Sequence, residues 1–230
     1  MTHPLQGISS MATRQVLADL AAAWQAQGGA AVAIESVGGV DAARRVQAGE
    51  EAFDVVFLAS DAIDRLHAAG RVAAGSKVDL VRSSTVAAVR AGAPRPDIGT
   101  GDALRAAVLA APSIGYSTGP SGVALQALFA RWGIADEVKQ RTVQAPPGVP
   151  VGTLIARGEV ALGFQQRSEL IHVEGIDILG PLPADIAIDT VFSGGVVAGT
   201  PHADTVRRLL AFMASPDAAG AKRRQGMEPA

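Results

Sequence analysis

The sequence predicts an α/β fold of two lobes, each a mainly parallel sheet flanked by helices, with two inter-lobe crossings of the chain. Three observations lead to this prediction. Short apolar segments alternate with amphipathic segments of helical period, which is the pattern of βα units. Two segments read as longer strands, 79–91 and 189–199, and they bracket a compact middle portion. Strand-to-helix turns rich in Gly, Ser and Thr recur along the chain.

The two long strands set the expected division into lobes. A strand that leaves one sheet and enters another carries the chain between lobes. We therefore expect a discontinuous lobe I, residues 1–82 plus 194–230, and an inserted lobe II, residues 83–193. Ligands of open α/β sheets bind outside the carboxyl ends of the strands, so we expect a ligand pocket between the lobes.

The remaining elements follow from apolar runs and from apolar residues spaced three or four apart. In lobe I the expected strands are 5–9, 30–35 and 54–58, and the helices that follow them are 11–27, 39–49 and 61–69. In the middle portion the expected strands are 113–116, 140–144 and 160–165, with helices at 101–110, 121–132 and 150–157. Helices at 202–214 and 216–225 complete lobe I.

Composition limits the class of protein. Hydrophobic residues make up 48% of the 230 residues, which is enough for well-packed cores. The formal net charge of -2, without a Lys/Arg cluster among aromatics, argues against a nucleic-acid partner. No apolar run of about 18 residues occurs, so we expect no membrane insertion.

The sequence carries no sign of metal or cofactor chemistry. It has no Cys, its four His are scattered, and it lacks a P-loop, a G-x-S-x-G elbow and a complete G-x-G-x-x-G after a strand. We expect no metal site and no cofactor. The start Met1-Thr2-His3-Pro4 lacks a basic and then apolar leader, so we expect a cytoplasmic protein, or a periplasmic one if a signal peptide has been removed.

The most informative segment is the turn at 115–122, Gly-Tyr-Ser-Thr-Gly-Pro-Ser-Gly, which opens a helix. A helix start leaves backbone N–H groups free, and hydroxyls beside them favour an anion. The candidate ligand contacts in this turn are Ser117, Thr118, Gly119, Ser121 and Gly122.

Turns of the same kind follow the strands of lobe I. Ser9 and Ser10 precede the first helix, and two hydroxyls in tandem exceed what one N-cap requires. Gly38 and Gly39 form a tight turn, an anion-binding nest, or both. Ser60 follows the third strand, where it either caps the next helix or contacts ligand.

Two arginines are candidate sources of positive charge. Arg82 stands at the expected lobe crossing, where it either projects into the pocket or lies on the surface of a hinge. Arg167 either binds ligand or pairs with Glu169 on a helix surface.

Several of these segments together resemble the molybdate-binding proteins of ABC transporters, which have the type II periplasmic-binding-protein fold. The segments are Gly7-Ile8-Ser9-Ser10-Met11, Val37-Gly38-Gly39, and residues 53–60, 116–122 and 158–163. With the C-terminal helix, the resemblance covers nearly the whole chain.

The resemblance implies a set of oxoanion contacts. It places a serine contact at Ser9 or Ser10, and backbone N–H contacts at Ser121 and at Val149 or Val151. A second serine position falls at Gly38 or Gly39, and a tyrosine position falls at Gln165 or Gln166, so these two contacts are changed. Gln amides and the Arg167 guanidinium suit planar carboxylates, which take paired hydrogen bonds.

The Ser-rich turns and the Gln-Gln-Arg segment are more similar to a branch that includes the bacterial aconitate isomerases. That similarity implies binding of a di- or tricarboxylate and an allylic proton shift, which needs donors for an enolate-like charge and a base. The candidate catalytic residues are Ser9, Ser10 and Glu35, and Glu169 is the other carboxylate near the motifs.

Two other functions stay open at this point. An exported receptor would bind molybdate or a similar oxoanion and deliver it to an ABC permease. A ligand-sensing half of a transcription factor ranks last, because no helix-turn-helix segment is evident.

Overall fold

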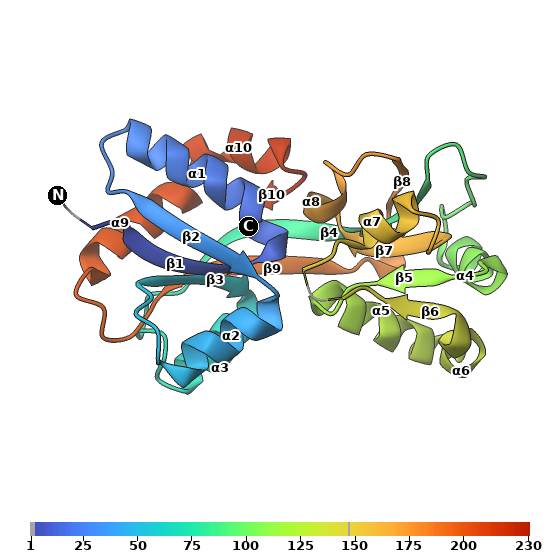
Figure 1. The fold of residues 1–230 in the computed structure, drawn as a ribbon, viewed down its shortest axis with the longest axis horizontal. Coiled ribbons are helices and arrows are strands. Elements are labelled where there is room, and N and C mark those ends of the chain that lie inside the picture. Colours follow the sequence, from blue (N-terminus) through green and yellow to red (C-terminus); the bar gives the residue numbers. More distant parts are fainter. Residues whose placement is uncertain (1–2, 147) are drawn as a thin grey trace. The chain divides into compact units, whose positions relative to one another are not determined.

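The computed structural model describes residues 3–146 and 148–230, and the chain divides into two compact units. Unit 1 comprises residues 1–82 and 191–230, and unit 2 comprises residues 83–190. The chain leaves unit 1 within β4 (Val78–Arg90) and returns within β9 (Asp189–Val196) (Figure 1). The two divisions follow residues 82 and 190.

Unit 1 begins with strands that each lead into a helix. They are β1 (Leu5–Ser10) with α1 (Arg14–Ala26), β2 (Val32–Val37) with α2 (Gly39–Ala48), and β3 (Val55–Ala59) with α3 (Ser60–Ala68). β1 is parallel to both β2 and β3, whereas β9 pairs with β3 in the antiparallel sense. α9 (Ala203–Ala214), α10 (Ala219–Arg224) and β10 (Glu228–Pro229), which is antiparallel to β4, follow β9.

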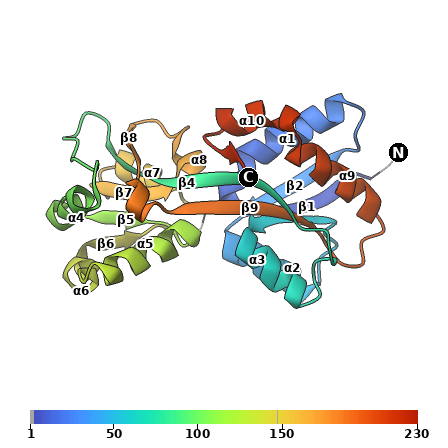
Figure 2. The same ribbon diagram turned by 180° about the vertical axis from the view of Figure 1, so that it is seen from behind.

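Two apolar cores cover the two faces of the unit 1 sheet, because side chains alternate along a strand. Val55, Phe57 and Ala59 of β3 pack with buried residues of α1, α9 and α10. Val56 and Leu58 pack with α2 and α3 on the other face. Figure 2 shows the same two helical layers from behind.

Unit 2 repeats the alternation of strand and helix. Its helices are α4 (Gly101–Ala110), α5 (Pro120–Arg131), α6 (Ala135–Val138), α7 (Val151–Ala156) and α8 (Arg167–Leu170). Its strands are β5 (Ile114–Tyr116), β6 (Thr142–Gln144), β7 (Leu162–Gln166) and β8 (Ile176–Pro181). β5 is parallel to β6 and β7, and β4 is antiparallel to β7 and β8.

The unit 2 sheet is also covered on both faces. Ala87 and Val89 of β4 belong to the core formed with α4 and α5. Val86 and Ala88 belong to the core formed with α7 and α8. Unit 2 is therefore a second three-layer sandwich with its own cores.

The predicted α/β fold is confirmed, with the expected strands and helices present and their ends shifted by a few residues. The strand expected at 189–199 ends at Val196, because a turn follows in which Gly199 has φ +85°. The elements α6, α8, β8 and β10 were not expected. No helix in the described part of the chain is long and apolar enough to cross a membrane.

Candidate functional site

Three parallel strands of unit 1 end together. Ser9 of β1 lies opposite Ser36 of β2 and opposite Phe57 of β3. We call the carboxyl ends of these strands and the turns that follow them the unit 1 edge. The edge contains the predicted contacts Ser9, Ser10, Gly38, Gly39 and Ser60, and in addition Ser36.

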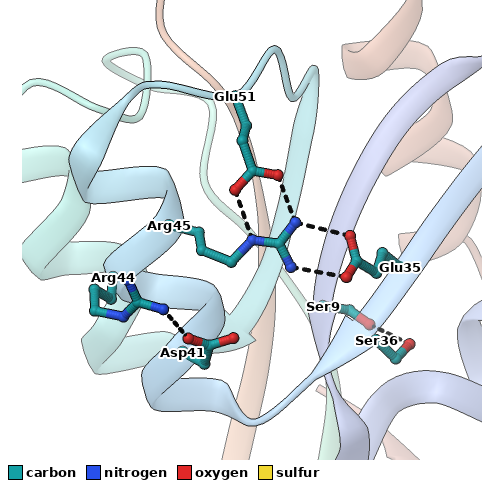
Figure 3. Close-up of polar contacts among 7 residues, drawn as sticks. All are labelled: Ser9, Glu35, Ser36, Asp41, Arg44, Arg45 and Glu51. Carbon is teal, nitrogen blue, oxygen red and sulfur yellow. Dashed lines mark hydrogen bonds and ion pairs between the residues drawn. The ribbon is translucent and has the colours of Figure 1, made fainter.

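Ser9 is fully buried, at 0% exposure, and its Oγ lies 2.8 Å from the Oγ of Ser36 (Figure 3). Ser9 Oγ also donates to the Ser10 carbonyl oxygen at 3.3 Å. Because a hydroxyl has one proton, Ser36 is then the donor within the pair. Half-buried Ser36 is the accessible member, and its place at the end of β2, two residues before Gly38, was the signal that could have found it.

Ser10 has a buried hydroxyl with no hydrogen-bond partner in the described part of the chain. A Cβ built on Gly39 would lie 3.5 Å from the Ser10 Cβ, so Ser10 stands beside the first residue of α2. The N-cap, Gly38, provides no side chain to cap this helix. An anionic group would complete this arrangement, because it accepts from both the hydroxyl and the helix-start amides.

Ser60 and Arg82 remain predicted ligand contacts. Ser60 is the first residue of α3, and no side chain caps that helix, so the capping role we considered for Ser60 is not seen. Arg82 is an exposed residue of β4 whose Cα is paired with that of Glu228, and it lies outside the unit 1 edge.

Glu35 on β2 is held by Arg45 of α2. The guanidinium donates to both carboxylate oxygens of Glu35, at 2.8 and 2.9 Å, and also to Glu51 (Figure 3). Hydrogen bonding to Arg45 lowers the pKa of Glu35 and the pKa of Glu51. A carboxylate stabilised in its charged form is a weak proton acceptor. These contacts count against Glu35 as the base.

Unit 2 presents an edge of the same kind. We call the carboxyl ends of β6, β5 and β7 and the turns that follow them the unit 2 edge, because the parallel register brings them together. In the turn after β5, Ser117 Oγ lies 3.2 Å from Ser121 Oγ. Ser117 Oγ also accepts the Gly119 N–H at 3.3 Å. Two of the predicted hydroxyls therefore converge at the start of α5, with half-buried Thr118 between them in sequence.

Gly122 has a steric role in this turn. A Cβ at this position would lie 1.8 Å from the Ser117 carbonyl oxygen, so a side chain does not fit. The Gly122 N–H donates to the Gly119 carbonyl oxygen at 3.0 Å. Gly122 shapes the turn, and its direct contact with ligand stays a prediction.

The two valines predicted as backbone donors already have acceptors. The Val149 N–H donates to the Pro146 carbonyl oxygen at 3.0 Å. The Val151 N–H, at the start of α7, donates to the Gln165 side-chain oxygen at 2.7 Å. A ligand that accepted from either N–H would have to replace these acceptors.

Gln165 links α7 to Glu169 on α8. Gln165 is 2% exposed, and its Nε2 donates to Glu169 Oε2 at 2.8 Å. Burial raises the pKa of Glu169 to about 7, while the hydrogen bond from Gln165 acts in the opposite direction. Arg167 is exposed and does not form the ion pair with Glu169 that we considered.

Gln166 is 1% exposed and belongs to a set of buried polar side chains in unit 2. Its Nε2 donates to Thr190 Oγ1 at 2.7 Å. In the part of the chain that the structure covers, Gln166 Oε1, Thr85 Oγ1 and Ser168 Oγ have no hydrogen-bond partner, and Thr85 lies opposite Gln166 in the sheet. Buried oxygens of this kind take ordered water or a ligand group. Sequence reasoning missed Thr85, Ser168 and Thr190.

Unit 1 also has a cavity of about 450 Å³ at the amino end of β3, lined in part by Asp54, Arg71 and Thr200. None of the predicted contacts lines it. Among the described residues, no group of three or more His, Asp or Glu is placed to hold a metal ion.

The family model for bacterial extracellular solute-binding proteins matches residues 5–228. The chain belongs to this family. Within the curated proteins, the aconitate isomerase of Pseudomonas sp. is 43% identical over 183 residues, which make up 79% of this chain and 70% of that protein.

Solved structures of solute-binding proteins share the fold. The periplasmic molybdate-binding protein of Azotobacter vinelandii has a TM-score of 0.80 and 20% identity, with 97% of this chain and 98% of that chain covered. The sulfate-binding protein SubI of Mycobacterium tuberculosis has a TM-score of 0.77 and 19% identity, with 99% of this chain and 87% of that chain covered. At these identities the likeness concerns the fold alone. The expected type II periplasmic-binding-protein fold is confirmed.

Proposed function

We propose that this solute-binding-family protein interconverts trans- and cis-aconitate by an allylic proton shift. The observation that carries the proposal is the 43% sequence identity to an aconitate isomerase, which extends over 79% of the chain. The alternative of a small-oxoanion receptor is supported by the solute-binding family model.

The chemistry of both edges supports this proposal. A tricarboxylate needs hydrogen-bond donors for its oxygens, and the same donors stabilise the enolate-like charge that develops when a proton leaves carbon. At the unit 2 edge Ser117 and Ser121 offer hydroxyls. At the unit 1 edge Ser10 and the start of α2 offer a hydroxyl and backbone amides.

The test is to incubate the purified protein with trans-aconitate in deuterated water and to follow both isomers by NMR. We expect the cis isomer to appear at a rate proportional to protein concentration, because a proton shift needs no other reactant. No isomerisation, together with tight binding of molybdate by calorimetry, would contradict the proposal.

A substitution at Ser10 tests the unit 1 edge. We expect Ser10→Ala to weaken trans-aconitate binding about tenfold, which is the effect of losing one hydrogen bond to a charged group. Stability should change little, because the hydroxyl has no protein partner to lose. Calorimetry measures the first effect and thermal unfolding the second.

Ser215→Ala is the matched control. Ser215 Oγ is also buried and without a partner in the described residues, but Ser215 follows α9 and lies on neither edge. Its loss should leave binding unchanged. If Ser10→Ala binds as well as the unaltered protein does, the unit 1 edge does not contact the substrate.

A receptor function is the second candidate, and the family to which the chain belongs favours it. In that case the protein would be exported, would bind molybdate or a similar oxoanion, and would deliver it to an ABC permease. Calorimetry with molybdate, sulfate and trans-aconitate separates the two proposals, because the isomerase proposal expects the tricarboxylate to bind most tightly.

A further inference from the structure

Glu169 differs from other carboxylates of the chain in what surrounds it. It lies on α8, directly after β7, at the unit 2 edge that also carries Ser117 and Ser121. Its Oε2 accepts one hydrogen bond from Gln165, and within residues 3–146 and 148–230 its Oε1 accepts none. One carboxylate oxygen is therefore fixed by the protein and the other is available.

The orientation of Gln165 is set by the backbone. The Val151 N–H is a donor, so the Gln165 atom that faces it must be the amide oxygen. The NH₂ group then necessarily points at Glu169. Since Gln165 is itself buried, this chain from the start of α7 to the carboxylate holds Glu169 in one position.

Among the described residues, no cation forms an ion pair with Glu169. α8 packs against β7 and α7, and neither Leu162–Gln166 nor Val151–Ala156 contains a titratable side chain. The one charged neighbour on α8, Arg167, is exposed and unpaired with Glu169. Burial accordingly raises the pKa of Glu169 to about 7, which suits a group that both takes and returns a proton near neutral pH.

We propose that Glu169 is the group that carries the migrating proton, and that Gln165 is the residue that positions it. This inference rests on the proposed aconitate isomerisation. The Glu169 carboxylate takes a proton from the CH₂ carbon of the substrate, and the C–H electron pair spreads over the allylic carbons and their carboxylates. The same carboxyl returns a proton to the carbon at the other end, where a new C–H bond forms. The double bond shifts, and no oxidant or reductant is consumed.

The decisive comparison is Glu169→Gln against the unaltered protein. Glutamine has the same shape and keeps an oxygen for the Gln165 NH₂ group, but it cannot accept a proton. We expect isomerisation to fall at least 100-fold, in line with general-base catalysis, while trans-aconitate binds within about fivefold of normal. Deuterium uptake from solvent should fall with it.

Glu174→Gln is the control, because Glu174 is an exposed glutamate that follows α8 in the chain. It should isomerise aconitate at the normal rate. If Glu169→Gln keeps more than a tenth of the activity while the unaltered protein is active, the role of Glu169 is wrong and the isomerase proposal stands. If the unaltered protein is itself inactive, the isomerase proposal fails first.

Gln165→Met tests the positioning role and does not depend on removing the carboxylate. It removes the hydrogen bond that lowers the Glu169 pKa, so the rising limb of kcat/KM against pH should move to higher pH by half a unit or more. Ionisation of the substrate is common to both proteins and does not cause such a shift. An unmoved limb would overturn the proposal, as would loss of binding without any change in kcat.

Discussion

At the scale of single residues, the surroundings that make Glu169 a good proton acceptor also lower the stability of the fold. A carboxylate without a cationic partner is destabilising when it is charged and buried. The unit 2 edge keeps such a group because its Gln165 partner is neutral, and a neutral donor leaves the pKa raised to about 7. An arginine partner, as Glu35 has, would stabilise the fold and abolish the basicity.

This conflict predicts a pH-dependent stability. The pKa of Glu169 is raised from 4.5 to about 7 in the folded protein, so the folded state binds more protons than the unfolded state between those values. Stability is therefore lost as pH rises through this window. Glu169→Gln should raise the free energy of unfolding at pH 8 by up to about 3 kcal/mol and should give no gain at pH 4.

Urea unfolding at pH 4 and pH 8 measures the effect, with Glu174→Gln as the variant expected to show none. An equal gain in the free energy of unfolding at both pH values would mean that the gain does not come from removing a buried charge.

Sequence alone located the polar turns but not the roles of single side chains. Ser9, Ser10, Ser117 and Ser121 stand where a strand meets a helix, and that position can be read from pattern. The pairing of Glu35 with Arg45, ten positions along the chain, depends on how α2 packs on β2. The environment of Glu169 depends on how α8 packs against α7 and β7 and on the hydrogen bond from Gln165. The sequence pattern shows neither the ion pair of Glu35 nor the packing around Glu169.

At the scale of elements, Arg45 joins α2 to the strand beside it and to the loop before β3. Its guanidinium binds Glu35 and Glu51 (Figure 3). It also lies 5.4 Å from the centre of the Phe53 ring. The last turn of α2 is thereby fixed, and with it the direction in which the first turn of α2 meets Ser10.

Arg45→Met should increase hydrogen exchange in α2 and in the loop 49–54, because it removes both carboxylate contacts. Arg45 lowers the pKa values of Glu35 and Glu51 from 4.5, so its stabilising effect is present above that pH and is lost as pH falls below it. Mass spectrometry of exchange at pH 7 measures the change.

Arg44→Met is the control for this prediction, since Arg44 pairs only within α2, with Asp41, and is exposed. It should leave exchange in the loop unaltered. Equal effects of the two substitutions would show that the contacts of Arg45 outside α2 do not hold the helix.

The sequence did not predict α6, α8, β8 and β10. α6 and α8 contain four residues each, which is too short for a helical period to be recognised. β8 is half-buried along most of its length, so it lacks the alternation of buried and exposed residues that marks a strand. The longer elements were predictable because each has a continuous buried run or a buried stripe.

At the scale of the whole molecule, each unit has its own apolar cores. Leu209 is fully buried in a core built from residues on both sides of unit 2 in the sequence. Leu125 is fully buried in a core confined to unit 2. The units should therefore respond separately to loss of core volume.

Leu209→Ala and Leu125→Ala should each lower stability by about 2–5 kcal/mol, the usual effect of such a cavity. Hydrogen exchange should quicken in residues 1–82 and 191–230 for the first variant, and in residues 83–190 for the second. Exchange that rises throughout the chain in both variants would mean that the two units unfold as one.

The insertion of unit 2 between the two segments of unit 1 has a consequence for synthesis on the ribosome. Residues 83–190 leave the ribosome before most of β9 and before α9 and α10. The α2 and α3 face of unit 1 draws almost entirely on the first segment, but the α1 face waits for Phe192, Leu209 and Met213. Since domains fold as units, unit 2 completes its cores before unit 1 does, and a chain that ends at residue 190 lacks the buried residues of α9 and α10 that pack with α1.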